Sequence, residues 1–362
     1  MSLSDILQSG RLAFWSWRIN QFRKQHTLNY LFWECTLSCN FFCRHCGSSA
    51  GRTHVTNELT TKEIKHALYT IAKDFDAKKI TLAVTGGEPL LRPDLFEVMA
   101  YASSLGFPWG MVTNGYLVTP AVVEAMKKTG MKTVVVSIDG IGKDHDQYRN
   151  MKGAYTRAIQ AVRLLADAKF LYDLQITTTV HKGNINQLER MYKTFLPLGI
   201  TSWRVFDVDP IGRAEGEQTL LLDGKELKKL LCFIQEKRKT APIDVTYGCG
   251  GFLGYAFEGA VRNHYFYCTT GINTGSILHT GDIFVCPNVP RVPSLIQGNV
   301  RKDRFSTVWN KKFSVFRTPN RTACEQCTSC YFWKECRGNS FHLWDFGKKE
   351  PKRCHLHMLE NI

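Results

Sequence analysis

Three cysteines stand close together near the start of the chain, at Cys39, Cys43 and Cys46. Three thiolates can hold three irons of a four-iron cluster and leave the fourth iron without a protein ligand. A metal centre that keeps one coordination position open is typical of catalysis, whereas a structural site is closed by four protein ligands. Spacing alone leaves a second interpretation, in which the thiolates bind zinc and His45 or Cys35 completes the site.

Polar residues follow the next three segments that we predict to be strands. They are Gly86-Gly87-Glu88-Pro89, Thr113-Asn114-Gly115 and Ser137-Ile138-Asp139-Gly140. Two adjacent glycines let the backbone approach a ligand closely, and a carboxylate accepts hydrogen bonds from an ammonium group. Arg149 comes next along the chain, and its guanidinium suits bidentate contact with a carboxylate.

In this order the motifs resemble those of the radical S-adenosylmethionine (SAM) superfamily, defined by C-x3-C-x2-C in the loop after the first strand of a barrel. The resemblance covers essentially the whole chain. It implies a 4Fe–4S cluster on the three cysteines, whose open iron binds the amino and carboxylate groups of SAM. It also implies reductive cleavage of SAM to a 5′-deoxyadenosyl radical, which abstracts a substrate hydrogen. The positions that match the family's SAM contacts are Gly86, Gly87, Glu88, Asn114, Ser137, Asp139 and Arg149.

The last third of the chain holds further cysteines in a specific pattern. They are Cys268, the end of Gly281-x4-Cys286, the run Cys327-x2-Cys330-x5-Cys336, and Cys354. This pattern resembles the SPASM extension, a domain with two auxiliary 4Fe–4S clusters. The resemblance implies an outer cluster on Cys327, Cys330, Cys336 and Cys354, and an inner cluster that includes Cys268 and Cys286. Zinc is the alternative, because C-x2-C pairs commonly bind it.

One position departs from the SPASM pattern. The family usually has a further cysteine four residues after Cys336, and here that residue is Ser340. The inner cluster therefore lacks one thiolate, and the chain carries one or two auxiliary clusters. Cys249 is the first candidate to complete it and Cys324 the second; alternatively one iron stays open for a substrate sulfur or amine.

The elements that must position these residues alternate between strands and helices. The predicted strands are Tyr30–Thr36, Ile80–Thr85, Trp109–Thr113, Thr133–Asp139, Leu174–Val180 and Trp203–Val208. Helical patterns lie between them, the first with Thr60 and Glu63 at capping-box spacing. Six such units predict a parallel sheet with right-handed crossovers, and polar strand ends favour a partial (β/α)6 TIM-like barrel.

The same patterns predict the domain organisation. We expect an N-terminal amphipathic extension at residues 1–27, a radical SAM barrel at 28–240 and a loop-rich, cysteine-rich SPASM domain at 241–362. In residues 11–26, one apolar helical face would cover the bottom of the barrel, in preference to touching a membrane surface. Bound metal would stabilise the C-terminal region, which has little periodic apolar pattern.

Composition limits the cellular compartment and the kinds of binding partner that we expect. The chain has 13 cysteines and no signal-peptide layout at its N-terminus, which favours a cytoplasmic protein with metal-bound thiols over disulfides. Cys35 and Cys232 have no assigned role, and we expect both to be buried apolar thiols. The net charge of +15 is scattered and partly offset by anionic clusters, so we expect no nucleic-acid partner, although an acidic substrate fits.

The resemblance also bounds the reaction. Relatives with this extension mostly modify peptides by crosslinking, epimerisation or side-chain oxidation, so the leading prediction is an oxidative peptide- or protein-modifying enzyme. The alternative is a dehydrogenase for a small molecule such as an aminoglycoside. An electron donor such as flavodoxin or ferredoxin is implied. About 28 residues precede the first strand, too few for a leader-binding domain, so a leader on the substrate would be bound by a separate protein or by the auxiliary domain. Pro287 replaces the Asp of sulfatase-maturing relatives, which argues against that activity.

Overall fold

A computed structural model describes residues 3–52, 56–317 and 324–362 of the chain. Ten strands form one sheet in the order β10-β9-β8-β1-β2-β3-β4-β5-β6-β7. They are β1 (Tyr30–Thr36), β2 (Thr81–Gly86), β3 (Trp109–Thr113), β4 (Thr133–Ser137), β5 (Asp173–Val180), β6 (Ser202–Asp207), β7 (Asp244–Tyr247), β8 (Thr274–Ile277), β9 (Asp282–Phe284) and β10 (Gly298–Asn299). A separate pair is formed by β11 (Trp344–Asp345) and β12 (Glu350–Pro351).

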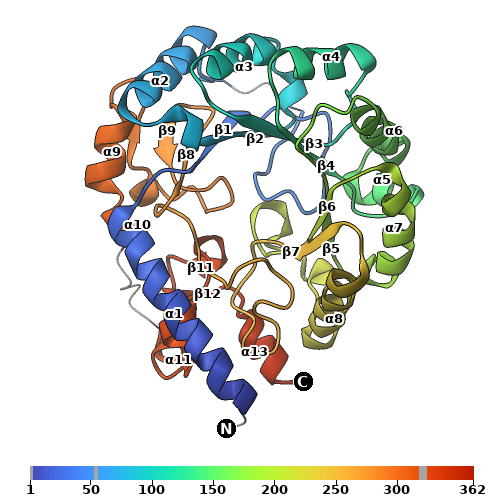
Figure 1. Ribbon diagram of the computed structural model, residues 1–362, viewed down its shortest axis with the longest axis vertical. Coiled ribbons are helices and arrows are strands. Elements are labelled where there is room, and N and C mark those ends of the chain that lie inside the picture. Colours follow the sequence, from blue (N-terminus) through green and yellow to red (C-terminus); the bar gives the residue numbers. More distant parts are fainter. Residues whose placement is uncertain (1–2, 53–55, 318–323) are drawn as a thin grey trace.

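The helices surround this curved sheet. They are α1 (Leu3–Gln25), α2 (Thr61–Asp74), α3 (Leu95–Ser104), α4 (Pro120–Lys128), α5 (Lys143–Arg149), α6 (Ala154–Asp167), α7 (Leu188–Phe195), α8 (Gly224–Thr240), α9 (Phe305–Lys312), α10 (Ser314–Arg317), α11 (Glu325–Thr328), α12 (Trp333–Cys336) and α13 (His355–Glu360). Figure 1 shows α2 to α8 outside the strands, with the C-terminal segments below the open side of the barrel. The predicted partial TIM-like barrel with a cysteine-rich C-terminal region is confirmed.

Strands β1 to β6 pair in parallel, each with the next. Along β1, Leu31 and Trp33 are fully buried in the core between sheet and helices. Side chains alternate between the two faces of a strand, so Tyr30, Phe32 and Glu34 point to the interior of the barrel. The residues paired with them on neighbouring strands point in the same direction. The strand register therefore identifies the side chains that face the barrel interior.

The sheet continues beyond the six predicted strands. β7 pairs in parallel with β6, and β8 pairs in parallel with β1, with Tyr30 beside Thr274. Segments on both sides of residue 240 therefore contribute to one sheet. The division of the chain near that residue stays a prediction.

Helix α2 begins as the sequence predicts. The Thr60 hydroxyl accepts a hydrogen bond from the Glu63 backbone amide, and the Glu63 carboxylate accepts one from the Thr60 amide. This reciprocal cap satisfies two backbone donors that the first helical turn leaves open.

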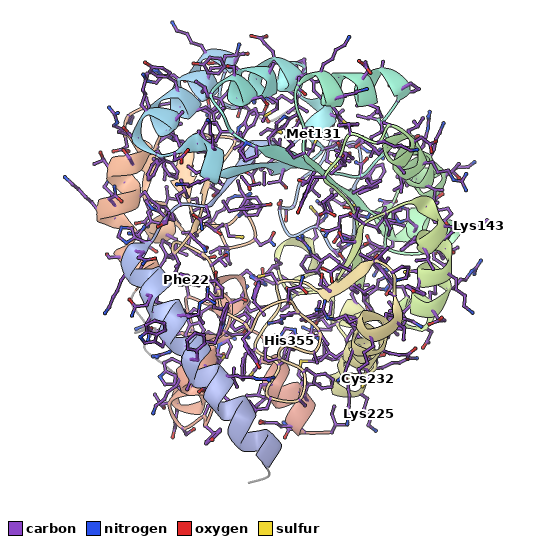
Figure 2. All side chains as sticks on the ribbon, in the orientation of Figure 1. Phe22, Met131, Lys143, Lys225, Cys232 and His355 are labelled. Carbon is purple, nitrogen blue, oxygen red and sulfur yellow. The ribbon has the colours of Figure 1, made fainter. Side chains whose placement is uncertain are left out.

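Helix α1 packs against the C-terminal region. Leu12 and Ile19 are buried, and the Trp15 ring lies 6.0 Å from His264 and 5.8 Å from Tyr267 between centroids. These ring contacts are with residues downstream of β7, which the sequence pattern did not identify as its partner. Phe22, labelled in Figure 2, joins the same aromatic group through Tyr267.

The opposite face of α1 carries two large apolar side chains. Phe14 is 59 % exposed and Trp17 is 57 % exposed, and their rings stack at 5.8 Å. Within the described residues, no helix is both long and apolar enough to cross a membrane.

Candidate active site

The three N-terminal cysteines lie in the loop that follows β1. Cys43 is buried with Phe41 and Ala154, and Cys39 and Cys46 pack against them. Burial raises the pKa of the Cys39 thiol to about 12, and the neighbouring Cys43 and Cys46 contribute to that increase. Three mutually close thiols in such surroundings become thiolates only beside a strong positive charge, which a bound metal supplies.

The separation of the thiols bears on the kind of metal. Among the described residues, no three cysteine Sγ atoms lie within 4.8 Å of one another. The sulfurs around one tetrahedral zinc ion stand about 3.8 Å apart. The zinc alternative also lacks its fourth ligand here, because Cys35 lies in the core outside the barrel and the His45 Nε2 atom lies 3.4 Å from an Asp139 oxygen. The donor set fits a multi-iron cluster.

Gly86 and Gly87 hold the end of β2 against the cysteine loop. A Cβ at Gly86 would lie 2.1 Å from the Thr36 carbonyl oxygen, and one at Gly87 would lie 2.1 Å from the Ser38 carbonyl oxygen. The Gly87 amide donates to the Thr36 carbonyl at 2.8 Å. Only glycine permits this approach, which fixes where the chain leaves β1 and enters the loop.

Glu88 joins the ends of β2 and β3. Its buried carboxylate accepts hydrogen bonds from the Thr113 hydroxyl and from the Asn114 amide, both at 2.8 Å. Burial raises its pKa to about 7, although these bonds oppose the increase. In this geometry Glu88 positions the two strand ends.

Asn114 connects β3 to the cysteine loop. Its Nδ2 atom donates to the Asn40 Oδ1 atom at 2.8 Å, and its Oδ1 atom accepts from the Tyr116 amide. Ser137, at the end of β4, is 8 % exposed, and within the described residues its hydroxyl has no hydrogen-bond partner.

Asp139 and Arg149 form a buried ion pair beside Cys43. The Arg149 Nε atom donates to Asp139 at 2.6 Å, and its Nη1 atom lies 3.8 Å from the Cys43 Sγ atom. Burial raises the pKa of Asp139, but the charges of Arg149, His45 and His145 and a hydrogen bond from the Thr179 amide together outweigh burial and lower the pKa to about 2. A permanent cation is thus fixed next to the Cys43 thiol.

The segment after β6 also holds the cysteine loop. Arg213 donates from Nε to the Cys43 carbonyl at 2.7 Å and from Nη1 to the Ala50 carbonyl at 2.6 Å. Its guanidinium lies 4.0 Å from the centroid of the Phe42 ring. A Cβ at Gly212 would lie 2.4 Å from the Cys46 carbonyl oxygen.

A stack of three rings covers another side of the loop. The His45 and Tyr148 rings are parallel with centroids 4.4 Å apart, and His181 stacks on the other face of Tyr148 at 3.9 Å. Burial lowers the pKa of His45 to about 3, so the stack is neutral near pH 7. His181 and Arg213 could not be predicted from the sequence, because no local motif marks residues that meet the loop from the segments after β5 and β6.

The structure brings Cys249 together with Cys268 and Cys286. Solvent reaches Cys249, yet the surrounding protein raises its pKa to about 12, with further contributions from Cys268 and Cys286. This proximity to both thiols is what its role as the first candidate for the inner site requires, and that role stays a prediction.

The remaining C-terminal cysteines form a second group. Burial raises the pKa of Cys327 to about 12, with further increases from a hydrogen bond to Cys324 and from the charges of Cys336 and Cys354. Cys330 acts in the same way on Cys354. Cys324 thus lies with the outer group. This position does not support it as the second candidate to complete the inner cluster.

Ser340 is fully buried beside the inner site. Its hydroxyl donates to the Gly250 carbonyl at 2.8 Å, next to Cys249 in the chain. Of the two cysteines without a role, Cys35 is buried as predicted, whereas the prediction for Cys232 is wrong because it is exposed on α8 (Figure 2). The buried residues of α8 are Leu227, Leu230, Leu231, Ile234 and Lys237, and position 232 lies off that stripe.

Two family profiles match this chain. The profile described as the Radical SAM superfamily matches residues 33–195, and SPASM, an iron–sulfur cluster-binding domain, matches residues 268–331. Among curated proteins, an AdoMet-dependent heme synthase of Methanosarcina barkeri is 30% identical over 88% of this chain and 94% of its own length. The mycofactocin maturase MftC of Mycolicibacterium smegmatis is 27% identical over 85% of this chain and 76% of its own length.

Solved structures share the fold. The protein anSMEcpe with bound AdoMet aligns with a TM-score of 0.72 at 16% identity, over 92% of this chain and 95% of that one. Streptococcus suis SuiB bound to its precursor peptide SuiA aligns with a TM-score of 0.69 at 18% identity, over 87% of this chain and 73% of that one.

Proposed function

The chain belongs to the radical SAM superfamily, with a SPASM iron–sulfur cluster-binding domain, and from that premise we propose that it oxidatively modifies a peptide or protein inside its barrel. Its cofactors are 4Fe–4S clusters and SAM. We also propose that the chain is divided into an N-terminal extension at residues 1–27, a radical SAM barrel at 28–240 and an auxiliary-cluster domain at 241–362.

The observation that carries the proposal is the position of two thiol groups relative to the barrel interior. Cys39, Cys43 and Cys46 follow the C-terminal end of β1. Cys286 acts electrostatically on Tyr30, at the other end of the same strand. Because strand residues rise about 3.3 Å each, the seven residues of β1 span about 20 Å. A substrate in the interior would lie between the two thiol groups.

Bound clusters and SAM would supply the cleavage of SAM, the hydrogen abstraction and an acceptor for a second electron. The chain contributes positioning. The N-terminal thiolates would hold one cluster, Cys249, Cys268 and Cys286 an inner one, and Cys327, Cys330, Cys336 and Cys354 an outer one.

The residues around the N-terminal cysteines fall into two groups: those whose polar atoms are bonded within the protein, and those with polar atoms left to contact SAM. Glu88, Asn114 and Asp139 are bonded within the protein, so we assign them to holding the loop and the backbone of Gly86 and Gly87 in place for SAM. Arg149 would orient the SAM carboxylate. Ser137 keeps a hydroxyl free to contact it.

A peptide substrate is supported by two relatives. MftC is named as a mycofactocin maturase, and SuiB binds its precursor peptide in the shared fold. A flavodoxin- or ferredoxin-type donor in the cytoplasm and a separate leader-binding protein complete this proposal.

A small molecule is the second candidate, and a specific observation favours a tetrapyrrole. The relative that is 30% identical over 88% of the chain is a heme synthase. Both candidates require a substrate that enters the barrel, so the substrate itself must be tested.

The test is anaerobic reconstitution with iron and sulfide, followed by SAM, a reductant and either peptides or a carboxylated porphyrin. We expect about twelve irons per chain, falling to about eight when Cys39, Cys43 and Cys46 are all changed to Ala, together with 5′-deoxyadenosine release and a mass loss on one substrate class. Cys232→Ala is the matched control. Zinc in place of iron, or no 5′-deoxyadenosine, would contradict the proposal.

A further inference from the structure

Arg204 is an inward-facing cation in the middle of β6. Its neighbours Trp203 and Val205 are fully buried in the core between sheet and helices, and Trp203 contacts Phe195 and Phe233 on α7 and α8. Since successive side chains alternate in direction, Arg204 points to the barrel interior. It pairs in register with Thr177 of β5.

No hydrogen bond or ion pair reaches the Arg204 side chain within the described part of the chain. Other charges on the interior face are compensated. Glu34 binds His279 at 2.7 Å and also Arg291, and Asp139 binds Arg149. Asp173, at the start of β5, bonds to the hydroxyls of Thr201 and Ser202. A guanidinium without a counter-ion among compensated groups is available for an external anion.

Tyr30 lies opposite Arg204. The two strands that carry them, β1 and β6, are separated by four others in the sheet, so a direct interaction must cross the interior. Burial raises the pKa of Tyr30, and the Arg204 charge opposes this increase. Tyr30 is nevertheless 38 % exposed, and its ring packs edge-on against Phe32 at 4.9 Å. Arg204 is exposed as well, so solvent reaches inward-facing side chains on both strands.

Three further polar atoms on this face of the sheet are buried and have no hydrogen-bond partner within the described residues. They are Thr177 Oγ1 beside Arg204, Gln175 Oε1 on the same strand, and Ser276 Oγ beside Phe32. Gln175 and Ser276 are at least nine-tenths buried, at 4 % and 0 % exposed. Buried polar atoms normally find a hydrogen-bond partner, so these three leave hydrogen-bonding capacity unused on strands next to those that carry Arg204 and Tyr30.

We propose that Arg204 and Tyr30 bind a carboxylate of the substrate inside the barrel, between the N-terminal cysteine site and the inner cysteine site. This inference rests on the proposed function and names the recognised group. The described inward-facing residues of β1 to β6 offer one uncompensated cation, which matches a single negative charge. A planar guanidinium binds a carboxylate through two parallel hydrogen bonds, and the Tyr30 hydroxyl can donate a third.

Such a carboxylate can belong to an acidic side chain of a peptide or to a tetrapyrrole. Two pairs of probes separate these sources: a capped peptide with one Glu side chain and its methyl ester, and coproporphyrin III and its tetramethyl ester. Binding to the cluster-loaded, SAM-bound enzyme is measured by calorimetry for the peptides and by absorbance for the porphyrins.

We expect at least one acid probe to bind the wild-type enzyme and its ester to bind at least tenfold more weakly. Arg204→Met should weaken acid binding by about tenfold to a hundredfold, Arg204→Lys should restore part of the loss, and Tyr30→Phe should cause a smaller loss. Arg163→Met, which alters an exposed arginine on α6, is the matched control. Iron content and near-ultraviolet circular dichroism check that each variant is folded.

Three results would overturn the inference: equal binding of acid and ester, equal binding by Arg204→Met and wild type, or no binding of either acid probe to the wild type. Failure of the proposed function is read separately, as absence of 5′-deoxyadenosine in the wild type and in Arg163→Met. A peptide-only or porphyrin-only response supports the inference and identifies the source.

Discussion

The two cysteine-bearing regions of the molecule are built in different ways. The loop with Cys39, Cys43 and Cys46 is held by strand ends and by side chains from distant segments, among them Asn114 and Arg213. The outer group around Cys327 to Cys354 sits among helices of four residues and strands of two. The first region is preorganised by the barrel, whereas the second consists of short elements, and we expect it to depend on bound metal.

The sharpest contrast is catalytic. Cys43→Ala should abolish 5′-deoxyadenosine release, because it removes a ligand of the open cluster site. Cys330→Ala should retain release but lose oxidised product and up to about four irons. Cys232→Ala, on the outside of α8, should match the wild type in both assays. Release of 5′-deoxyadenosine by Cys43→Ala would contradict the prediction that only the N-terminal cysteine region is needed for SAM cleavage.

Removal of iron should separate the regions by stability. After chelation under reducing conditions, amide exchange in residues 324–352 should rise by at least tenfold, while β2 to β5 keep their protection. Mass spectrometry of peptic fragments measures both regions in one sample. Equal loss of protection in the strands would mean that the barrel also depends on metal.

The glycines at the end of β2 test preorganisation directly. Gly86→Ala places a Cβ 2.1 Å from the Thr36 carbonyl at a φ of +136°, and should lower the free energy of unfolding by more than about 3 kcal/mol. Gly10→Ala, in α1 with nothing within 4 Å of the new Cβ, should raise it by about 0.5–1 kcal/mol. Urea denaturation compares the two variants, and a neutral Gly86→Ala would refute the close approach.

Arg213, in the segment after β6, tests how much its hydrogen bonds hold the cysteine loop; we call these bonds the clamp. Arg213→Ala removes two hydrogen bonds to carbonyls of the cysteine loop and should cost about 2 kcal/mol of stability. It should also speed iron loss to a chelator. Arg163→Ala supplies the control, and an unchanged rate of iron loss in Arg213→Ala would show that the clamp is dispensable.

The smallest effect concerns pH. Burial raises the pKa of Glu88 to about 7 from 4.5, so the folded state binds its proton more tightly than the unfolded state. Its contribution is fully present below pH 4.5 and is lost as pH rises towards 7, at no more than about 1.4 kcal/mol per pH unit. Burial lowers the pKa of His145 to about 4, which gives the opposite slope below pH 6.5.

Glu88→Gln isolates the contribution of Glu88, because His145 is unchanged in the variant. We expect the stability difference between wild type and variant to shift against the wild type as pH rises from 4.5 to 7. Thermal unfolding at five pH values measures this shift. A difference that stays constant over the window would mean that Glu88 ionises normally.

The sequence allowed the barrel to be predicted closely because its strands are local apolar runs. Tyr30–Thr36 and Trp109–Thr113 have the predicted bounds, and Leu174–Val180 misses one residue of β5. Strands β7 to β10 were not predicted, since they have four residues or fewer and no periodic pattern. Their existence depends on partners elsewhere in the sheet.

The same limit applies to the site. The cysteine motifs and the Gly-Gly-Glu turn are local and could be recognised, and the roles assigned to their residues stay predictions. Arg213 meets Cys43 across 170 residues of chain, and Arg204 faces Tyr30 only because the sheet curves. No spacing in the sequence encodes such contacts, because they arise from tertiary closure.

The parallel pairing of β8 with β1 has a consequence for synthesis. Tyr30 lies beside Thr274, and Glu34 at the end of β1 reaches His279, so one edge of β1 has no partner until roughly three quarters of the chain has been made. A ribosome that adds about 5–20 residues per second leaves that edge open for tens of seconds. An exposed edge strand invites pairing with other chains, so this edge of β1 is open to such pairing during synthesis.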